Sequence, residues 1–179
     1  MSVHQVPRFD PARHHRRSIR KRTHDYTSPG FYFVTFCTHE RYPLFGQLVQ
    51  KQVELNELGC IAYDRWNSIP GHYAHVVLHA FTIMPDHMHG IIELTAYDRC
   101  DHRSVSDGQR PLGPVPGSLG AIVGSYRAGV SREINRSVFQ RRPMIWQRGY
   151  HDIIIRNVVM LDRITRYVLR HPNMLLPEQ

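Results

Sequence analysis

A chain of 179 residues is long enough to bury one hydrophobic core and short for two separate domains. Hydrophobic residues make up 41% and charged residues 21%, a composition that argues against wholesale disorder. The formal net charge of +8 favours a polyanionic partner, nucleic acid before an anionic membrane, and three distant cysteines indicate neither a disulfide framework nor a cysteine zinc site.

The N-terminal residues 1–25 are predicted to form a basic, flexible arm, because they offer few apolar side chains for burial. The start of the chain has no apolar segment typical of a secretory signal, and no apolar run approaches the ~20 residues that span a bilayer. We therefore expect a soluble, cytoplasmic protein with no membrane partner. Residues 26–179 are predicted to form a single domain, in which residues 95–117 are a loop rich in Gly, Pro, Asp and Ser.

The first half of the domain begins with an aromatic and β-branched segment, residues 30–37, which predicts a strand. A short alternation through Val53 and Leu55 indicates a minor strand. Asn56 then caps a helix with apolar residues at helical spacing, and Pro70 and Gly71 stop it.

Two further strands, residues 76–84 and 87–94, are separated only by Pro85 and Asp86, which predicts a hairpin. Ser118 caps a helix with one apolar stripe, a strand is expected around residues 153–155, and a final helix covers about 158–171. This order predicts an α+β fold, with a ferredoxin-like antiparallel sheet and helices packed mainly on one face.

The motif His87-Met88-His89 opens the second strand of the hairpin. Residues i and i+2 of a strand point to the same face, so both imidazoles can reach one metal ion while Met88 faces the opposite layer. With thirteen histidines in the chain, chance pairs are expected, and the motif alone favours two hydrogen-bonded or exposed histidines over metal ligands.

The final helix places Tyr167 and His171 on one face together with Met160 and Ile164. This apolar face should turn toward the sheet, so the phenol and the imidazole are expected near it. The alternatives are a core tyrosine with its hydroxyl satisfied and a histidine stabilised by the helix dipole.

Residues 81–92, which contain the His-x-His motif, resemble the His-hydrophobic-His signature of the single-tyrosine HUH transposases. Residues 145–157 and 163–172 resemble the corresponding blocks of the REP-associated tyrosine transposase branch, and residues 16–20 and 30–35 fit that branch too. The blocks occur in the family's order and together cover most of residues 16–172.

The resemblance implies that His87 and His89 bind a divalent metal ion and that Tyr167 attacks the scissile phosphate. It further implies a 5′-phosphotyrosine intermediate and a free 3′-OH, which permits rejoining to another strand. The family's third ligand, usually an amide, lies four residues after the tyrosine, where this chain has His171. Imidazole would shift the preference from Mg²⁺ toward Mn²⁺ or Zn²⁺. Relatives also commonly carry a histidine at the position of Ile153, so both substitutions leave open a partial loss of activity.

The implied partner is single-stranded or hairpin DNA of the REP type, with the basic arm reading bases that flank the hairpin. For Arg127, Gln147 and Arg148, solvated surface groups are the alternative interpretation. The predicted DNA-binding residues are Arg16, Arg17, Arg20, Arg22, Tyr126, Arg127, Gln147 and Arg148. Nothing in the sequence chooses between a monomer and a homodimer.

Two residues have competing interpretations. Tyr150 is a rival nucleophile, although a structural or DNA-stacking role is the preferred interpretation. Asp86, next to the histidine pair, is either a base or a turn residue.

Three functional hypotheses follow. The leading one is a tyrosine transposase, an endonuclease and strand transferase that cuts and rejoins single-stranded DNA with a divalent metal ion. The second is a catalytically impaired protein on the same fold that binds DNA hairpins, and it is motivated by His171 and Ile153. The third is a small metallohydrolase that activates water on Zn²⁺, and it predicts turnover without a covalent protein–DNA species.

Overall fold

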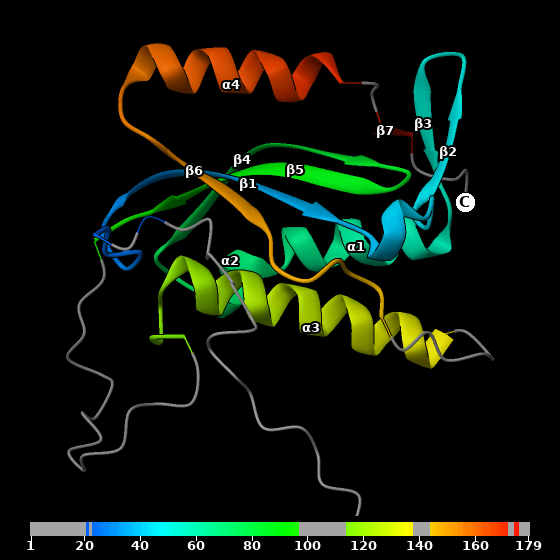
Figure 1. Ribbon diagram of the computed structural model, residues 1–179, viewed down its shortest axis with the longest axis horizontal. Coiled ribbons are helices and arrows are strands. Elements are labelled where there is room, and N and C mark those ends of the chain that lie inside the picture. Colours follow the sequence, from blue (N-terminus) through cyan, green and yellow to red (C-terminus); the bar gives the residue numbers. More distant parts are fainter. Residues whose placement is uncertain (1–20, 22, 97–113, 138–143, 172–173, 176–179) are drawn as a thin grey trace, which may run out of the picture.

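The computed structural model describes residues 21, 23–96, 114–137, 144–171 and 174–175, and for the last pair only the backbone (Figure 1). The predicted DNA-contacting residues Arg16, Arg17, Arg20 and Arg22 lie outside the described residues, as does the part of the expected 95–117 loop that spans 97–113. Within the described parts, no helix combines the length and the apolar character required to cross a membrane.

A four-stranded antiparallel sheet forms the centre of the domain, with strand order β4-β5-β1-β6. Its strands are β1 (Gly30–Cys37), β4 (Val76–Met84), β5 (His87–Leu94) and β6 (His151–Ile155). Together with the helices α1 and α3 between them, these strands give the βαββαβ order of a ferredoxin-like fold. The predicted α+β class is therefore confirmed.

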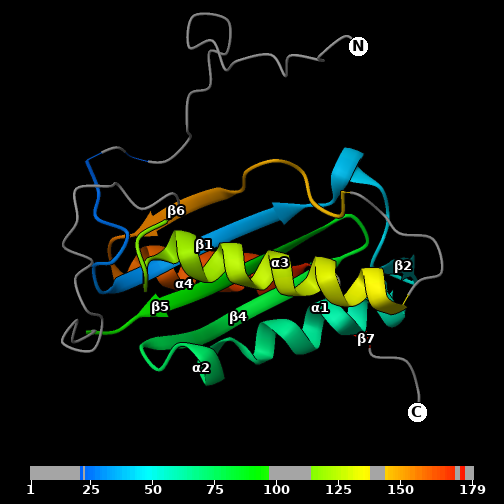
Figure 2. The same ribbon diagram turned by 90° about the horizontal axis from the view of Figure 1, so that it is seen from below.

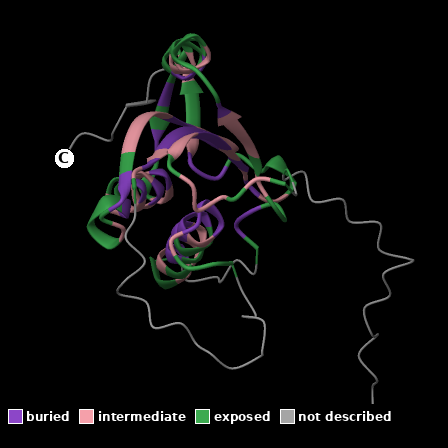
Figure 3. Cartoon of the chain, turned by 90° about the vertical axis from the view of Figure 1, so that its left-hand side faces the viewer, coloured by how far each residue is buried: buried purple, intermediate pink, exposed green. Residues whose placement is uncertain are grey.

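Three helices cover one face of this sheet: α1 (Glu57–Asn67), α2 (Ile69–His72) and α3 (Leu119–Ser137) (Figures 1 and 2). The helix α4 (Val158–Arg170) lies alone on the opposite face. Helices thus pack mainly on one face, as expected, but the helix that carries Tyr167 is the exception. Figure 3 shows the resulting layers, with buried residues concentrated where the sheet meets the helices.

The side chains of the strands alternate between these two layers. Tyr32, Val34 and Phe36 of β1 join the large core under α1 and α3, whereas Phe33 belongs to a smaller cluster under α4. In β5, Met88 joins the large core and Ile91 joins the smaller one. His87 and His89 therefore face α4, because they alternate with Met88.

A smaller sheet lies beside the main one, with strand order β2-β3-β7. The hairpin of β2 (Gly46–Val49) and β3 (Gln52–Leu55) is longer than the single minor strand predicted there. The strand β7 (Met174–Leu175) follows α4 and pairs in parallel with β3. This backbone pairing connects the chain beyond α4 to the β2–β3 hairpin.

Candidate active site

Two histidines from β5 meet Tyr167 of α4 and His171, which caps the end of that helix, in the space between the sheet and α4. The ring centroids of His87 and His89 are 4.8 Å apart, and His171 lies 5.0 Å from His89 and 6.2 Å from His87. The ring of Tyr167 is 4.6 Å from that of His171, and its hydroxyl lies 3.4 Å from Nε2 of His89. The structure thus brings together the four side chains that the sequence singled out.

Helix α4 presents Tyr167 and His171 to the sheet because its apolar face packs there. Ile164 and Val168 are buried against the cluster under α4. Asn157 caps the helix, and its side chain accepts a hydrogen bond of 2.8 Å from the backbone N–H of Met160. The ring of Tyr167 meets Phe33 edge-on, yet the residue remains 48% exposed. Its hydroxyl therefore lies near the histidines, on a side chain that is about half exposed.

A hydrogen-bond partner holds the Nδ1 atom of each histidine of the pair. His87 Nδ1 donates to the carboxylate of Asp86 at 2.6 Å, and the other oxygen of Asp86 lies 3.0 Å from Nε of Arg41. His89 Nδ1 shares a hydrogen bond of 2.8 Å with the hydroxyl of Thr35 on β1. These partners fix the ring orientations and leave Nε2 of each ring for the site, as in metal-binding histidines.

Burial keeps two of the three imidazoles neutral. Desolvation, followed by the charges of His87, His171 and Arg41, lowers the pKa of His89 to about 3. Desolvation and then His87 also lower the pKa of His171. A neutral imidazole is the form that binds metal ions. Nε2 of His171 is buried and has no hydrogen-bond partner among the described residues, so it is an unsatisfied donor or acceptor in a ring that lies beside this cluster.

The three imidazoles have the chemistry to bind a divalent ion, but their arrangement in the structure does not form a metal site. Imidazole nitrogens suit Zn²⁺, Mn²⁺ and related ions, and the unpartnered Nε2 of His171 lacks only a ligand. Within the described ranges, however, no three His, Cys, Asp or Glu side chains are arranged to hold a metal ion. Metal binding therefore requires the imidazoles to rotate. His171 is placed to do so, because it follows the last residue of α4.

Comparison with known proteins identifies a relative in sequence and solved structures with a similar fold. No protein-family model matches the chain. An uncharacterized protein of Haemophilus influenzae is 34% identical over 170 residues, which cover 92% of each chain. The chain belongs to the same family as that protein.

Among solved structures, a REP-associated tyrosine transposase bound to a REP hairpin matches 83% of this chain and 70% of its own. The TM-score is 0.56 and the sequence identity is 14%, so the two proteins share a fold. A transposase candidate from Deinococcus radiodurans R1 covers 86% of this chain at a TM-score of 0.47 and 14% identity. The match to the REP-associated tyrosine transposase shows that this chain has the fold of that protein.

The rival nucleophile, Tyr150, lies on the other side of the sheet. Its ring packs edge-on against Phe36, 5.8 Å between centroids, within the core under α1 and α3. The histidine pair faces α4 instead, so Tyr150 and the pair are on opposite faces.

Asp86, the other residue with two interpretations, has both carboxylate oxygens engaged, by His87 and by Arg41. It orients a histidine rather than standing free as a base.

Tyr126 and Arg127, two of the predicted DNA contacts, have structural partners. Tyr126 is 4% exposed, and its hydroxyl contacts the carbonyl of Ala62 and the sulfur of Met88. Burial raises its pKa, and the structure places it in the core instead of at a DNA-binding surface. The guanidinium of Arg127 donates to the carbonyl groups of Gln147 and Gly149, which fixes the segment before β6.

The two remaining predicted contacts, Gln147 and Arg148, are exposed in that same segment. Their side chains stay available to a partner.

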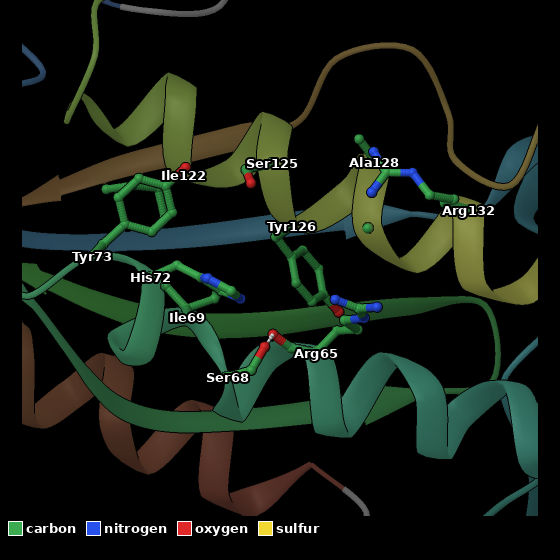
Figure 4. Close-up of a pocket in the computed structure, with 11 residues that line it drawn as sticks. Arg65, Ser68, Ile69, His72, Tyr73, Ile122, Ser125, Tyr126, Ala128 and Arg132 are labelled. Carbon is green, nitrogen blue, oxygen red and sulfur yellow. Dashed lines mark hydrogen bonds between the residues drawn. The ribbon is translucent and has the colours of Figure 1, made fainter.

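A cavity of about 420 Å³ lies between α1, α2 and α3, on the face of the sheet away from Tyr167 (Figure 4). Arg65, His72 and Arg132 contribute to its lining, and Arg65 is paired with Glu133. None of the residues that line it belongs to the histidine cluster. The cavity therefore takes no part in the candidate active site.

Sequence reasoning missed the residues that orient the histidines. Thr35 lies 54 positions before His89 and meets it only because β1 pairs with β5 in register. Arg41 reaches Asp86 from a 3₁₀ helix (His39–Arg41) that the sequence did not predict. The one sequence signal for an orienting residue was that Asp86 directly precedes His87.

Proposed function

We propose that this protein is a metal-dependent enzyme that cleaves and rejoins single-stranded DNA, with Tyr167 as nucleophile. The observation that carries the proposal is the place of the Tyr167 hydroxyl, 3.4 Å from Nε2 of His89 and close to His171. A half-exposed phenol beside neutral imidazoles is unusual for a structural tyrosine, whose hydroxyl is normally satisfied in the core.

The reaction proposed for this phenol is a phosphoryl transfer. The oxygen of Tyr167 forms a bond to the scissile phosphorus while the bond to the 3′ oxygen breaks, and the leaving 3′ oxygen takes up a proton. The product is a 5′-phosphotyrosine, which a 3′-OH of another strand can attack in the reverse sense to rejoin DNA. A phenol with a pKa near 10 needs help to react at neutral pH.

That help is proposed to come from a divalent ion, Mg²⁺ or Mn²⁺ with Zn²⁺ as a further candidate, held by His87, His89 and His171. When bound, the ion would favour the phenolate and polarise a non-bridging phosphate oxygen. The protein's own residues prepare the site. Asp86 and Thr35 hold the two β5 imidazoles, and Phe33 supports the ring of Tyr167 from its edge.

Hairpin DNA is the proposed partner. The formal net charge of +8 favours a polyanion, and the solved protein that shares the fold is bound to a REP hairpin. The exposed Gln147 and Arg148, together with the arginines of the N-terminal arm, are proposed to contact phosphates or flanking bases.

The experiment is an adduct assay with two tyrosine variants. Labelled single-stranded hairpin DNA is incubated with the protein and Mn²⁺, and a covalent complex that survives SDS is expected. Tyr167→Phe should abolish the complex, because it lacks the attacking oxygen. Tyr150→Phe is the matched control and should form it normally. An undiminished adduct in Tyr167→Phe would refute the assignment.

A second candidate function is favoured by the histidine geometry. Within the part of the chain that the structure describes, no three metal-binding side chains are arranged to hold an ion, and His171 stands where the family usually has an amide. A non-catalytic protein that binds DNA hairpins would retain salt-sensitive binding and form no adduct with Mg²⁺, Mn²⁺ or Zn²⁺. Turnover without an adduct would instead indicate a metallohydrolase.

A further inference from the structure

The outer edge of the main sheet carries a second feature beside the candidate active site. Strand β6 pairs with β1 on one side, and it ends the sheet order on the other. A cavity of about 520 Å³ lies along this edge, and its lining includes Lys21, His151, Ile153, Arg156 and Met160. We call it the β6 groove.

The lining of the β6 groove combines basic and apolar side chains. Lys21, His151 and Arg156 are exposed, and their side chains have no hydrogen bond or ion pair with any other described residue. Ile153 and Met160 are half-buried and belong to the edge of the cluster under α4. The acidic lining residue Asp152 is engaged by the hydroxyl of Tyr26 at 2.7 Å. The groove therefore presents two cationic side chains and a histidine against one carboxylate, around an apolar floor.

Strand register connects this groove to the candidate active site. His151 is the partner of Thr35 across β1 and β6, and Thr35 is the partner of His89 across β1 and β5. Directly opposed residues of antiparallel strands point to the same face, so His151, Thr35 and His89 form one row across the sheet. At about 4.8 Å per strand, His151 lies roughly 10 Å from His89.

Helix α4 also connects the β6 groove to the candidate active site. Met160 in its first turn lines the groove, and Tyr167 stands seven positions later, about 10 Å along the helix axis. The groove thus wraps around the β6 edge, with Tyr26 and Ile154 on the side of the large core and with Ile153 and Met160 in the layer that also holds Tyr167.

We infer that the β6 groove binds the single-stranded segment of DNA that adjoins the scissile phosphate. Basic side chains would track the phosphates, as in other grooves that bind single strands, while the bases contact the apolar floor. The inference rests on the proposed function, because it places the scissile phosphate at Tyr167. It adds a binding site of its own, however, and this site can be tested without cleavage.

The test measures DNA binding in EDTA by fluorescence anisotropy, in a Tyr167→Phe background. Three probes share one hairpin: a blunt form, a form with a 5′ single-stranded extension, and a form with a 3′ extension. The groove variant is Lys21→Glu with Arg156→Glu. The matched control is Arg132→Glu with Arg136→Glu, two exposed residues of α3 on the other face of the sheet.

The groove variant should bind one extended hairpin at least about tenfold more weakly, with less than a twofold change for the blunt hairpin. Its salt slope on that probe should fall by about 0.7 for each phosphate that the variant no longer neutralises. The control variant should affect extended and blunt probes alike. His151→Ala, which removes the ring without reversing a charge, should weaken binding of the same extended probe.

An equal loss on all three probes, or no loss, overturns the inference. In the latter case the open edge of β6 is better suited to pair with a strand of another polypeptide. The outcome is separable from that of the adduct assay. If the adduct forms and the groove variant binds normally, only the groove assignment fails. If no adduct forms and the extension effect is present, only the catalytic proposal fails.

Discussion

Asp86 connects the histidine cluster to the turn between β4 and β5. Its side chain accepts from His87 and from Arg41, and its backbone carbonyl accepts from the N–H and the hydroxyl of Thr38. These contacts hold Asp86 in place, and Asp86 in turn orients the imidazole of His87. A carboxylate behind a metal-binding histidine holds the ring in one tautomer and makes it a better ligand.

The variant Asp86→Ala should therefore weaken metal-dependent cleavage. Loss of an orienting carboxylate typically lowers metal affinity or activity by about 10- to 100-fold. Adduct formation measured against Mn²⁺ concentration should show a higher midpoint, with recovery at saturating metal. Asp162→Ala is the control, because among the described residues Asp162 pairs with Arg166 alone, on the exposed side of α4. Equal Mn²⁺ midpoints for Asp86→Ala and the wild type would exclude this role.

The candidate site was predictable in part at the residue scale. His87 and His89 share a face because alternate residues of a strand do so, and Tyr167 and His171 share one because they are a helical turn apart. Both rules are local. The role of Thr35 depends on strand pairing, and the burial of Tyr126 depends on which stripe of α3 meets the sheet. Tyr126 belongs to the predicted apolar stripe, and this already favoured the core.

Among the contacts between secondary-structure elements, the one at Gly90 determines how closely α1 approaches β5. A methyl group added to its Cα would lie 2.6 Å from Cη2 of Trp66, well inside van der Waals contact. Trp66 is completely buried in the core, where Phe36, Phe81 and Tyr126 surround its ring. Because these rings enclose the indole, a side chain at position 90 would force the indole or its neighbours to shift.

We expect Gly90→Ala to reduce the free energy of unfolding by about 2 kcal/mol, the middle of the range for overpacked cores. Urea denaturation measures the change. Gly124→Ala is the opposite control, because a methyl group at this position of α3 meets no atom within 4 Å. That variant should gain up to about 1 kcal/mol from helix propensity. If Gly90→Ala is as stable as the wild type, Trp66 must be able to shift.

Local patterning predicted the long elements better than the short ones. The helix from residue 158 and the hairpin of β4 and β5 were predicted nearly to their ends, because periodicity and turn residues mark them. The helix predicted to stop at Pro70 instead gives way to α2, which contains that proline in its first turn, where a missing N–H does no harm. Strand β7 has two residues and no pattern to detect.

The arrangement of the whole molecule was predictable only as a class. Alternation of strands and helices indicated a ferredoxin-like sheet, but the position of β1 between β5 and β6 depends on contacts between distant segments. Periodicity shows that α4 has a buried face without showing which side of the sheet covers it. That choice of side creates the candidate active site, since it places α4 opposite the face of β5 that carries the histidines.

Burial of the histidines in this layer has a consequence for the stability of the whole fold. An unfolded histidine takes up a proton near pH 6.5, whereas His89 in the folded protein does so only at about pH 3. Between these values the unfolded state binds more protons, so the free energy of unfolding must fall as the pH falls. The lowered pKa of His171 acts in the same direction.

From pH 7 to pH 5, His89 alone should remove on the order of 2 kcal/mol of stability in the metal-free protein. Urea unfolding at both pH values, in EDTA, measures the loss. His89→Gln should lose less on acidification than the wild type, because its side chain does not titrate, whatever its stability at pH 7. Parallel pH dependence in His89→Gln and the wild type would mean that the imidazole of His89 is hydrated and able to ionise in the folded protein, contrary to its burial between β5 and α4.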